Sequence, residues 1–153
     1  MKNLKIIFIH LFFILMHSMV SGQAFKLEEL ASFNSLDMDT FKKEIKKQNY
    51  TFYDKTEGLG FVVNEYDSPG YLYKITKFEY QEDKSQDHIE FTFKDKKDYD
   101  AYLKAVLGAG YQPAEKGKIM TGESYTDYYK NKKQIRIVQP KKAKEPYTLL
   151  IFK

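Results

Sequence analysis

The chain has 153 residues, including 13 Tyr and 12 Phe but neither Cys nor Trp. The absence of cysteine excludes disulfide bonds, thiolate metal sites and thiol catalysis, so stability depends on an aromatic-rich core. The charge is divided unevenly. Residues 23–94 carry 14 acidic residues and 10 lysines, whereas residues 95–153 carry 13 basic and seven acidic residues. Opposite charges favour docking of the two halves on each other or the orientation of a charged partner.

Residues 1–22 have the pattern of a cleavable secretory signal peptide. Two lysines lie within residues 1–5, an apolar stretch follows over residues 6–16, and small residues occupy positions 20–22. A membrane anchor is the alternative, but a spanning helix needs about 20 predominantly apolar residues, which this stretch lacks. No cysteine follows that could carry a lipid. We therefore expect export to the periplasm or the extracellular space, with no membrane span after cleavage.

The first predicted elements are a lead-in segment and a helix. Residues Phe25–Phe33 form the lead-in segment, which is compatible with a short helix. Asn34 is a good N-cap residue, and Asp37 lies three positions later, where a carboxylate favours the positive end of a helix. Phe41 and Ile45 follow with the i, i+4 spacing of one helical face. The sequence therefore predicts a helix that begins after Asn34.

Three strands are predicted after this helix. Their ranges are 60–66, 71–81 and 88–94. In the last of them apolar and polar residues alternate over Ile89–Phe93, which is the period of a half-buried strand. In the middle strand the apolar parity changes between Ile75 and Phe78, which predicts a β-bulge around residues 76–77.

The same order of elements is predicted in residues 95–153. At an offset of 61 residues the cap and the apolar positions of the first helix recur, at Asp95, Tyr102 and Val106. Strands are predicted over residues 124–130, 134–139 and 147–152. A hairpin turn is predicted at Asn131-Lys132, and a lysine-rich loop over residues 140–146.

These elements predict an α+β fold built as a tandem αβββ-αβββ repeat, in which a helix is followed by a three-stranded antiparallel sheet, twice. The predicted organisation is a signal peptide at 1–22, a lead-in segment and first unit at 23–94, and a second unit at 95–153, packed as one domain. The pattern leaves open whether the units share one sheet or form two lobes. In this topology the chain resembles the secreted β-lactamase inhibitory proteins, with no shared sequence motif.

Residues with catalytic potential are few. After signal cleavage His88 is the only histidine; Asp87 or Ser85 can assist it in a hydrolase, but a surface loop around it is the simpler interpretation. Asp95 and Asp98 are explained better by helix capping than by a calcium loop. No carboxylate pair for glycoside hydrolysis stands out. We therefore predict no catalytic residue, no metal site and no cofactor.

The best candidate binding surface is the lysine-rich hairpin with its interleaved tyrosines, and further tyrosines on the predicted strands are a separate indication of binding. The candidate binding residues are Tyr71, Tyr73, Tyr128, Tyr129, Lys130, Lys132, Lys133 and Arg136. Clustered cations favour acidic partners, and tyrosine is enriched at binding hot spots. The alternatives are core packing for the tyrosines and protection of a sheet edge for the lysines. Because export is expected, we predict that the partner is a protein or an acidic glycan and not nucleic acid.

These features favour a small exported, non-enzymatic binding module, such as a protein inhibitor or an immunity-type protein that acts in the periplasm or outside the cell. Two alternatives stay open. One is a secreted hydrolase that uses His88 or a carboxylate pair, and the other is a structural component of the cell envelope.

Overall fold

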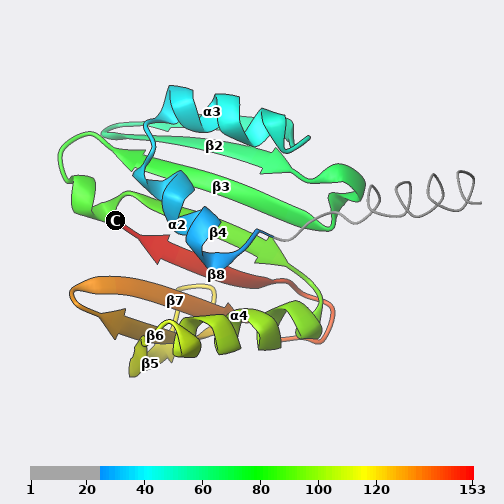
Figure 1. Cartoon of the computed structure of the whole chain (residues 1–153), viewed down its shortest axis with the longest axis vertical. Coiled ribbons are helices and arrows are strands. Elements are labelled where there is room, and N and C mark those ends of the chain that lie inside the picture. Colours follow the sequence, from blue (N-terminus) through cyan, green and yellow to red (C-terminus); the bar gives the residue numbers. More distant parts are fainter. Residues whose placement is uncertain (1–24) are drawn as a thin grey trace, which may run out of the picture.

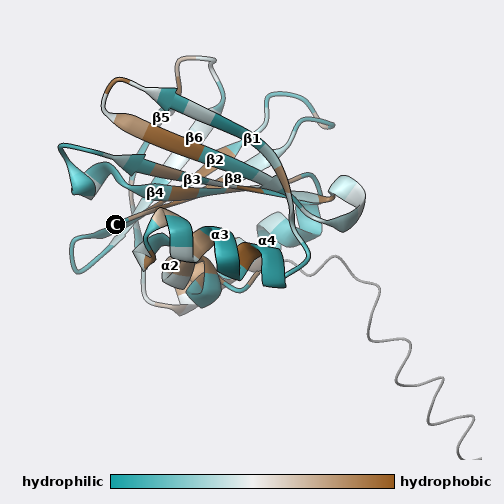
Figure 2. Cartoon of the chain, turned by 90° about the horizontal axis from the view of Figure 1, so that it is seen from above, coloured by the Kyte–Doolittle hydropathy of each residue, from teal (hydrophilic) through white to brown (hydrophobic). Residues whose placement is uncertain are grey.

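The structure is a computed structural model that describes residues 25–153. Within this range the chain forms one eight-stranded antiparallel sheet and three α-helices, and the helices lie on the same face of the sheet (Figures 1 and 2). The predicted signal peptide at 1–22 lies outside the described residues. Among residues 25–153, no helix has the length and apolar character that a membrane-spanning helix requires.

The helices are α2 (Leu27–Ser35), α3 (Met38–Lys47) and α4 (Lys96–Gly108). The predicted cap at Asp95 is confirmed, since its carboxylate accepts a hydrogen bond from the Lys97 N–H at 2.8 Å. The predicted helix start after Asn34 is wrong, because the chain forms two helices there and Asp37 caps the second. Asn34 instead lies buried in α2, where its amide donates to the Ile151 carbonyl at 2.9 Å.

Eight strands form the sheet. They are β1 (Thr51–Gly58), β2 (Phe61–Asp67), β3 (Tyr73–Tyr80), β4 (His88–Phe93), β5 (Gln112–Lys118), β6 (Ser124–Lys130), β7 (Lys133–Gln139) and β8 (Tyr147–Phe152). Their order in the sheet is β1-β2-β3-β4-β8-β7-β6-β5, and every neighbouring pair is antiparallel. Strands β4 and β8 therefore lie at the centre, and β1 and β5 form the two edges.

The predicted tandem αβββ-αβββ repeat is wrong, because two helices precede the first strands and each half of the chain supplies four strands, not three. All eight strands form one continuous sheet, in which β4 pairs with β8. The sequence pattern misses β1 and β5. Both are edge strands with side chains exposed along almost their whole length, so they lack the apolar alternation that marks a strand. Strand β5 also contains Pro113 and Gly117, which are tolerated at a sheet edge. The other six strands lie within two residues of the predicted ranges.

The predicted β-bulge in β3 is also wrong. Strand β3 pairs with β2 and β4 in unbroken register over residues 74–78. Apolar side chains occupy both faces of this strand: Ile75 belongs to the core under the helices, whereas Phe78 points to the opposite face. Register shifts occur instead in the pairing of the edge strands β1 and β5.

The hydrophobic core lies between the helices and the sheet face that they cover. It includes Leu30, Phe41, Ile45, Tyr66, Ile75, Ile89, Phe91, Phe93, Tyr102, Val106, Ile135, Ile137, Leu149 and Ile151. Phe91 of β4 has a central place, with its ring centroid 5.8 Å from those of Phe25 and Tyr102. Burial of these large apolar side chains is the main driving force for folding.

The predicted connections around β7 are confirmed. Asn131 and Lys132 form the turn between β6 and β7 with φ angles of 47° and 68°. Two consecutive residues in the left-handed region are typical of a type I′ hairpin turn, whose twist matches that of the strands. The lysine-rich loop over residues 140–146 connects β7 to β8.

Candidate binding face

Among the residues that the structure describes, one face of the sheet is not covered by a helix (Figure 2). We call it the open face. In Figure 2 the outer strands β1, β5 and β6 lie farther from the helices than β4 and β8 do, so the sheet bends and the open face is concave. The strand register identifies the side chains on this face, because directly paired residues of neighbouring strands point to the same side of a sheet.

Five rings run across the open face on β2, β3, β4 and β8. We call them the aromatic row, and its members are Phe61, Tyr80, Phe78, His88 and Phe152. The Phe78 ring stacks on the His88 ring with a centroid distance of 4.3 Å, and the Phe152 ring lies 5.3 Å from His88. Phe61 and Tyr80 extend the row, and their ring centroids are 6.1 Å apart. All members except His88 are only partly buried, so the row presents apolar surface.

His88 is the most buried member of the aromatic row. It begins β4 and is 8% exposed, rather than lying in a surface loop. Its Nδ1 lies 2.7 Å from the Gln86 carbonyl oxygen, which can only accept, so Nδ1 carries a proton in this geometry. Its Nε2 faces Glu90 Oε1 at 3.6 Å.

The residues that were predicted to assist His88 are engaged elsewhere. The Asp87 carboxylate accepts a hydrogen bond from the Tyr80 N–H at 2.7 Å and lies 3.2 Å from Lys153 Nζ. Ser85 donates to the Asp83 side chain at 2.6 Å. The observed contacts of His88 are therefore those of a packing group, and the hydrolase alternative stays an untested prediction.

A second row crosses all eight strands beside the aromatic row. From β1 to β5 in sheet order its members are Asp54, Glu65, Thr76, Glu90, Leu150, Arg136, Asp127 and Glu115, and we call it the charged row. Arg136 donates two hydrogen bonds of 2.7 and 2.8 Å to Asp127 and lies 3.9 Å from the Tyr125 ring centroid. The hydrogen bonds to Asp127 raise the pKa of Arg136. The resulting ion pair carries no net charge at this position of the face.

The structure divides the predicted binding residues between several places. Tyr129 and Arg136 lie on the open face, on the neighbouring strands β6 and β7. Tyr73 and Tyr128 point to the helix side: Tyr128 is buried in the core, and Tyr73 donates a hydrogen bond of 3.0 Å to Asp98. The predicted set is therefore not one patch.

The remaining predicted residues lie at the ends of the sheet. Tyr71 is exposed in the turn η1 (Pro69–Tyr71) between β2 and β3. Lys132 occupies the β6–β7 turn, and Lys130 and Lys133 pair with each other beside it on the helix side. The Lys130 ammonium donates to the Ala109 carbonyl, at the end of α4. A binding role for these residues stays a prediction.

Sequence reasoning missed most of the open face. The residues that it did not single out for binding include Phe61, Phe78, Glu90, Leu150 and Phe152. Two signals for them were present. The parity change within residues 71–81 indicates apolar groups on both faces, and the unbroken apolar run over residues 149–152 is typical of a central strand.

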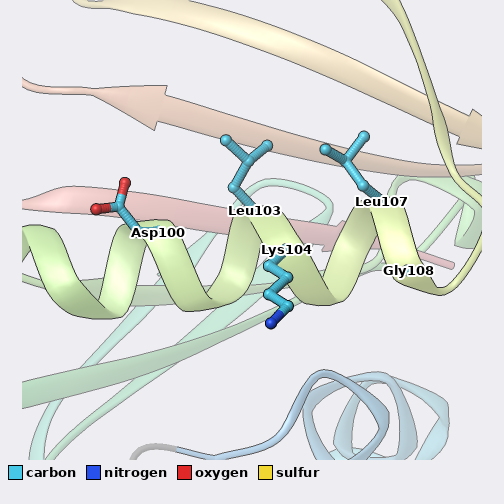
Figure 3. A pocket seen from close by; sticks show the side chains of 5 residues that line it. All are labelled: Asp100, Leu103, Lys104, Leu107 and Gly108. Atoms are coloured by element: carbon cyan, nitrogen blue, oxygen red, sulfur yellow. The ribbon is translucent and has the colours of Figure 1, made fainter.

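A shallow hollow of about 530 Å³ lies beside α4, on the helix side of the molecule (Figure 3). It is lined by Asp100, Leu103, Lys104, Leu107 and Gly108. In Figure 3 Leu103 and Leu107 point to one side of α4 and Lys104 to the other. Leu107 is 46% exposed, so this position is a suitable control for substitutions on the open face.

Within residues 25–153 no group of three or more His, Asp or Glu side chains is placed to hold a metal ion. Comparisons with protein-family models, with curated proteins and with solved structures give no match to this chain. The open face is therefore the feature on which a proposal for function rests.

Proposed function

We propose that this chain is a small exported, non-enzymatic module that binds another protein through the open face. The supporting observation is the aromatic row together with Leu150. These side chains come from four adjacent strands, all but His88 are partly exposed, and no helix lies over them in the described part of the chain. A contiguous apolar patch rimmed by charged residues fits a protein interface. A role as an inhibitor or immunity-type protein is one way in which such a module acts.

The outer hairpins add apolar contacts at the border of the open face. Leu59 lies in the turn between β1 and β2, and Met120 lies in the turn between β5 and β6. Both side chains are fully exposed. Because the outer strands bend away from the helices, these turns border the concave face and are suited to contact a partner that is seated in it.

Aromatic rings near both edges of the open face lie directly over neighbouring glycines, which leave room for them. Gly117 of the edge strand β5 is paired with Tyr125, whose ring lies so close that a Cβ at this glycine would be 2.7 Å from the Tyr125 hydroxyl. On the other edge, a Cβ at Gly58 would collide with the Phe61 ring. Rings that already pack on the sheet before binding lose less conformational entropy in an interface than freely rotating ones.

Capture experiments with two leucine variants test this proposal. We expect the immobilised chain to retain a protein from the exported fraction of its source cells, and Leu150→Ser to weaken that binding about tenfold or more, as for an interface hot spot. Leu107→Ser makes the same change on the helix side and should leave binding unchanged. Circular dichroism first checks that both variants are folded. Equal binding by the wild type and both variants would contradict docking on the open face.

A further inference from the structure

The open face carries an excess of negative charge. Its carboxylates are those of Asp54, Glu65, Asp67, Glu90, Glu115 and Asp127, and its cations are those of Lys74 and Arg136. Each cation is held by a carboxylate of the same face. Lys74 Nζ lies 2.9 Å from Glu65, and Arg136 Nε lies 2.7 Å from Asp127. After these pairings the face presents carboxylates to a partner and no unengaged Lys or Arg among residues 25–153.

Glu90 is the carboxylate at the centre of the face. It lies on the central strand β4, with Thr76 and Leu150 as its register partners on either side. Its side chain is 32% exposed. Within residues 25–153 the only basic nitrogen within 4.0 Å of this carboxylate is His88 Nε2, at 3.6 Å. A half-buried carboxylate beside apolar groups gains strongly from a cation that reaches it, because water screens the pair less there.

We propose that the open face receives a basic segment of the partner protein, in which a Lys or Arg pairs with Glu90 while a neighbouring apolar side chain packs on Leu150 and the aromatic row. This inference rests on the proposed function and adds the chemistry of the partner. Charge complementarity argues for it: the carboxylates of the face that lack an internal cation attract a basic segment and repel an acidic one. An acidic glycan is disfavoured at this face for the same reason.

Three synthetic peptides of equal length serve as probes. They alternate Lys with Leu, Glu with Leu, and Lys with Ser. In nuclear magnetic resonance titrations of the full chain after signal cleavage, we expect the Lys/Leu peptide to shift signals of Glu90 and Leu150 and to bind at least about tenfold more tightly than the other two. Glu90→Gln should weaken this binding about tenfold. Glu28→Gln, the same change on an exposed position of α2, should have no effect.

The outcomes distinguish docking on the open face from recognition of a basic segment. Tight binding of the Glu/Leu peptide, or equal binding to the wild type and Glu90→Gln, would overturn the basic-segment inference. If Leu150→Ser weakens capture of the natural partner while Glu90→Gln does not, the docking face stands and only the inference fails. If neither variant weakens capture, docking on the open face fails as well. Concentration-dependent self-association that Glu90→Gln abolishes would identify the occupant as a second copy and overturn the proposed partner.

Discussion

Two buried tyrosine hydroxyls in the core differ in their hydrogen bonding. The Tyr102 hydroxyl donates to the Phe25 carbonyl at 2.5 Å. The Tyr50 hydroxyl is buried and has no hydrogen-bond partner among the described residues. A buried polar group with a partner contributes about 1 kcal/mol to stability, whereas one without a partner costs the free energy of its lost hydration.

We expect Tyr102→Phe to lower the free energy of unfolding by about 1 kcal/mol, because the Phe25 carbonyl loses its donor. Tyr50→Phe removes an unsatisfied group and should cause no loss or a small gain. Urea denaturation of the two variants measures both values. Equal losses in the two variants would contradict the hydrogen bonding described here.

Lys77 is a buried cation whose role depends on tertiary structure. Its side chain is fully buried on the helix side of β3, and its Nζ donates to the Asn34 carbonyl, at the end of α2, at 3.2 Å. A cation is favourable at a helix C-terminus, where carbonyl groups lack partners within the helix. Burial nevertheless lowers the pKa of Lys77, because the charged form loses hydration.

The β6–β7 hairpin combines an unbroken strand register with a strained turn. Asn131 suits the left-handed conformation, but Lys132 is a poor residue for a φ of 68°. Lys133 already pairs with Lys130 as the last pair of the two strands. The left-handed conformation of Lys132 is therefore a requirement of the turn alone.

We expect Lys132→Gly to stabilise the protein by about 1 kcal/mol, because glycine adopts this conformation without steric cost. Lys133→Gly removes the same charge from a strand position and should destabilise it by a similar amount. Thermal unfolding compares the two variants. A loss of stability in Lys132→Gly would show that its side chain has a structural role that outweighs the turn strain.

The inner strands could be predicted from the sequence, because their alternation and turns are local signals. The helix cap at Asp95 and the turn at Asn131-Lys132 could be predicted for the same reason. The edge strands β1 and β5 could not be predicted from the sequence, because their side chains are exposed and show no apolar alternation. The open face could not be assembled either, because Glu90 and Leu150 meet only through the pairing of β4 with β8, which are far apart in the chain.

The sheet has one face that packs against the helices and one face that no helix covers in the described part of the chain. The helix side holds the core cluster, which includes Tyr50 and Tyr102, and the partly buried Tyr73 packs against it. Burial raises the pKa of Tyr50 and Tyr102 well above the ordinary value. Burial and the hydrogen bond to Asp98 raise the pKa of Tyr73 to about 12.

These shifts predict a loss of stability at alkaline pH. Above pH of about 10 the unfolded chain releases phenol protons that the folded chain keeps, so stability is complete below this pH and falls as pH rises through the folded-state pKa values. Lys77 has the opposite sign, but its contribution ends at its ordinary pKa of 10.5. Urea denaturation between pH 9 and pH 12 (roughly one unit below to two above the ordinary tyrosine pKa) should show the decline, with a smaller slope in Tyr102→Phe. Tyrosinate absorbance that develops fully at pH of about 10 in the folded protein would contradict it.

Docking on the open face is tested most directly by methyl nuclear magnetic resonance of the chain with its captured partner. Leu150, Val63 and Val138 report on the open face, and Leu103 and Leu107 report on the helix side. We predict that the partner shifts or broadens the methyl signals of the first three residues and leaves those of the other two unchanged. Changes confined to Leu103 and Leu107 would place the partner on α4 and contradict the proposed binding face.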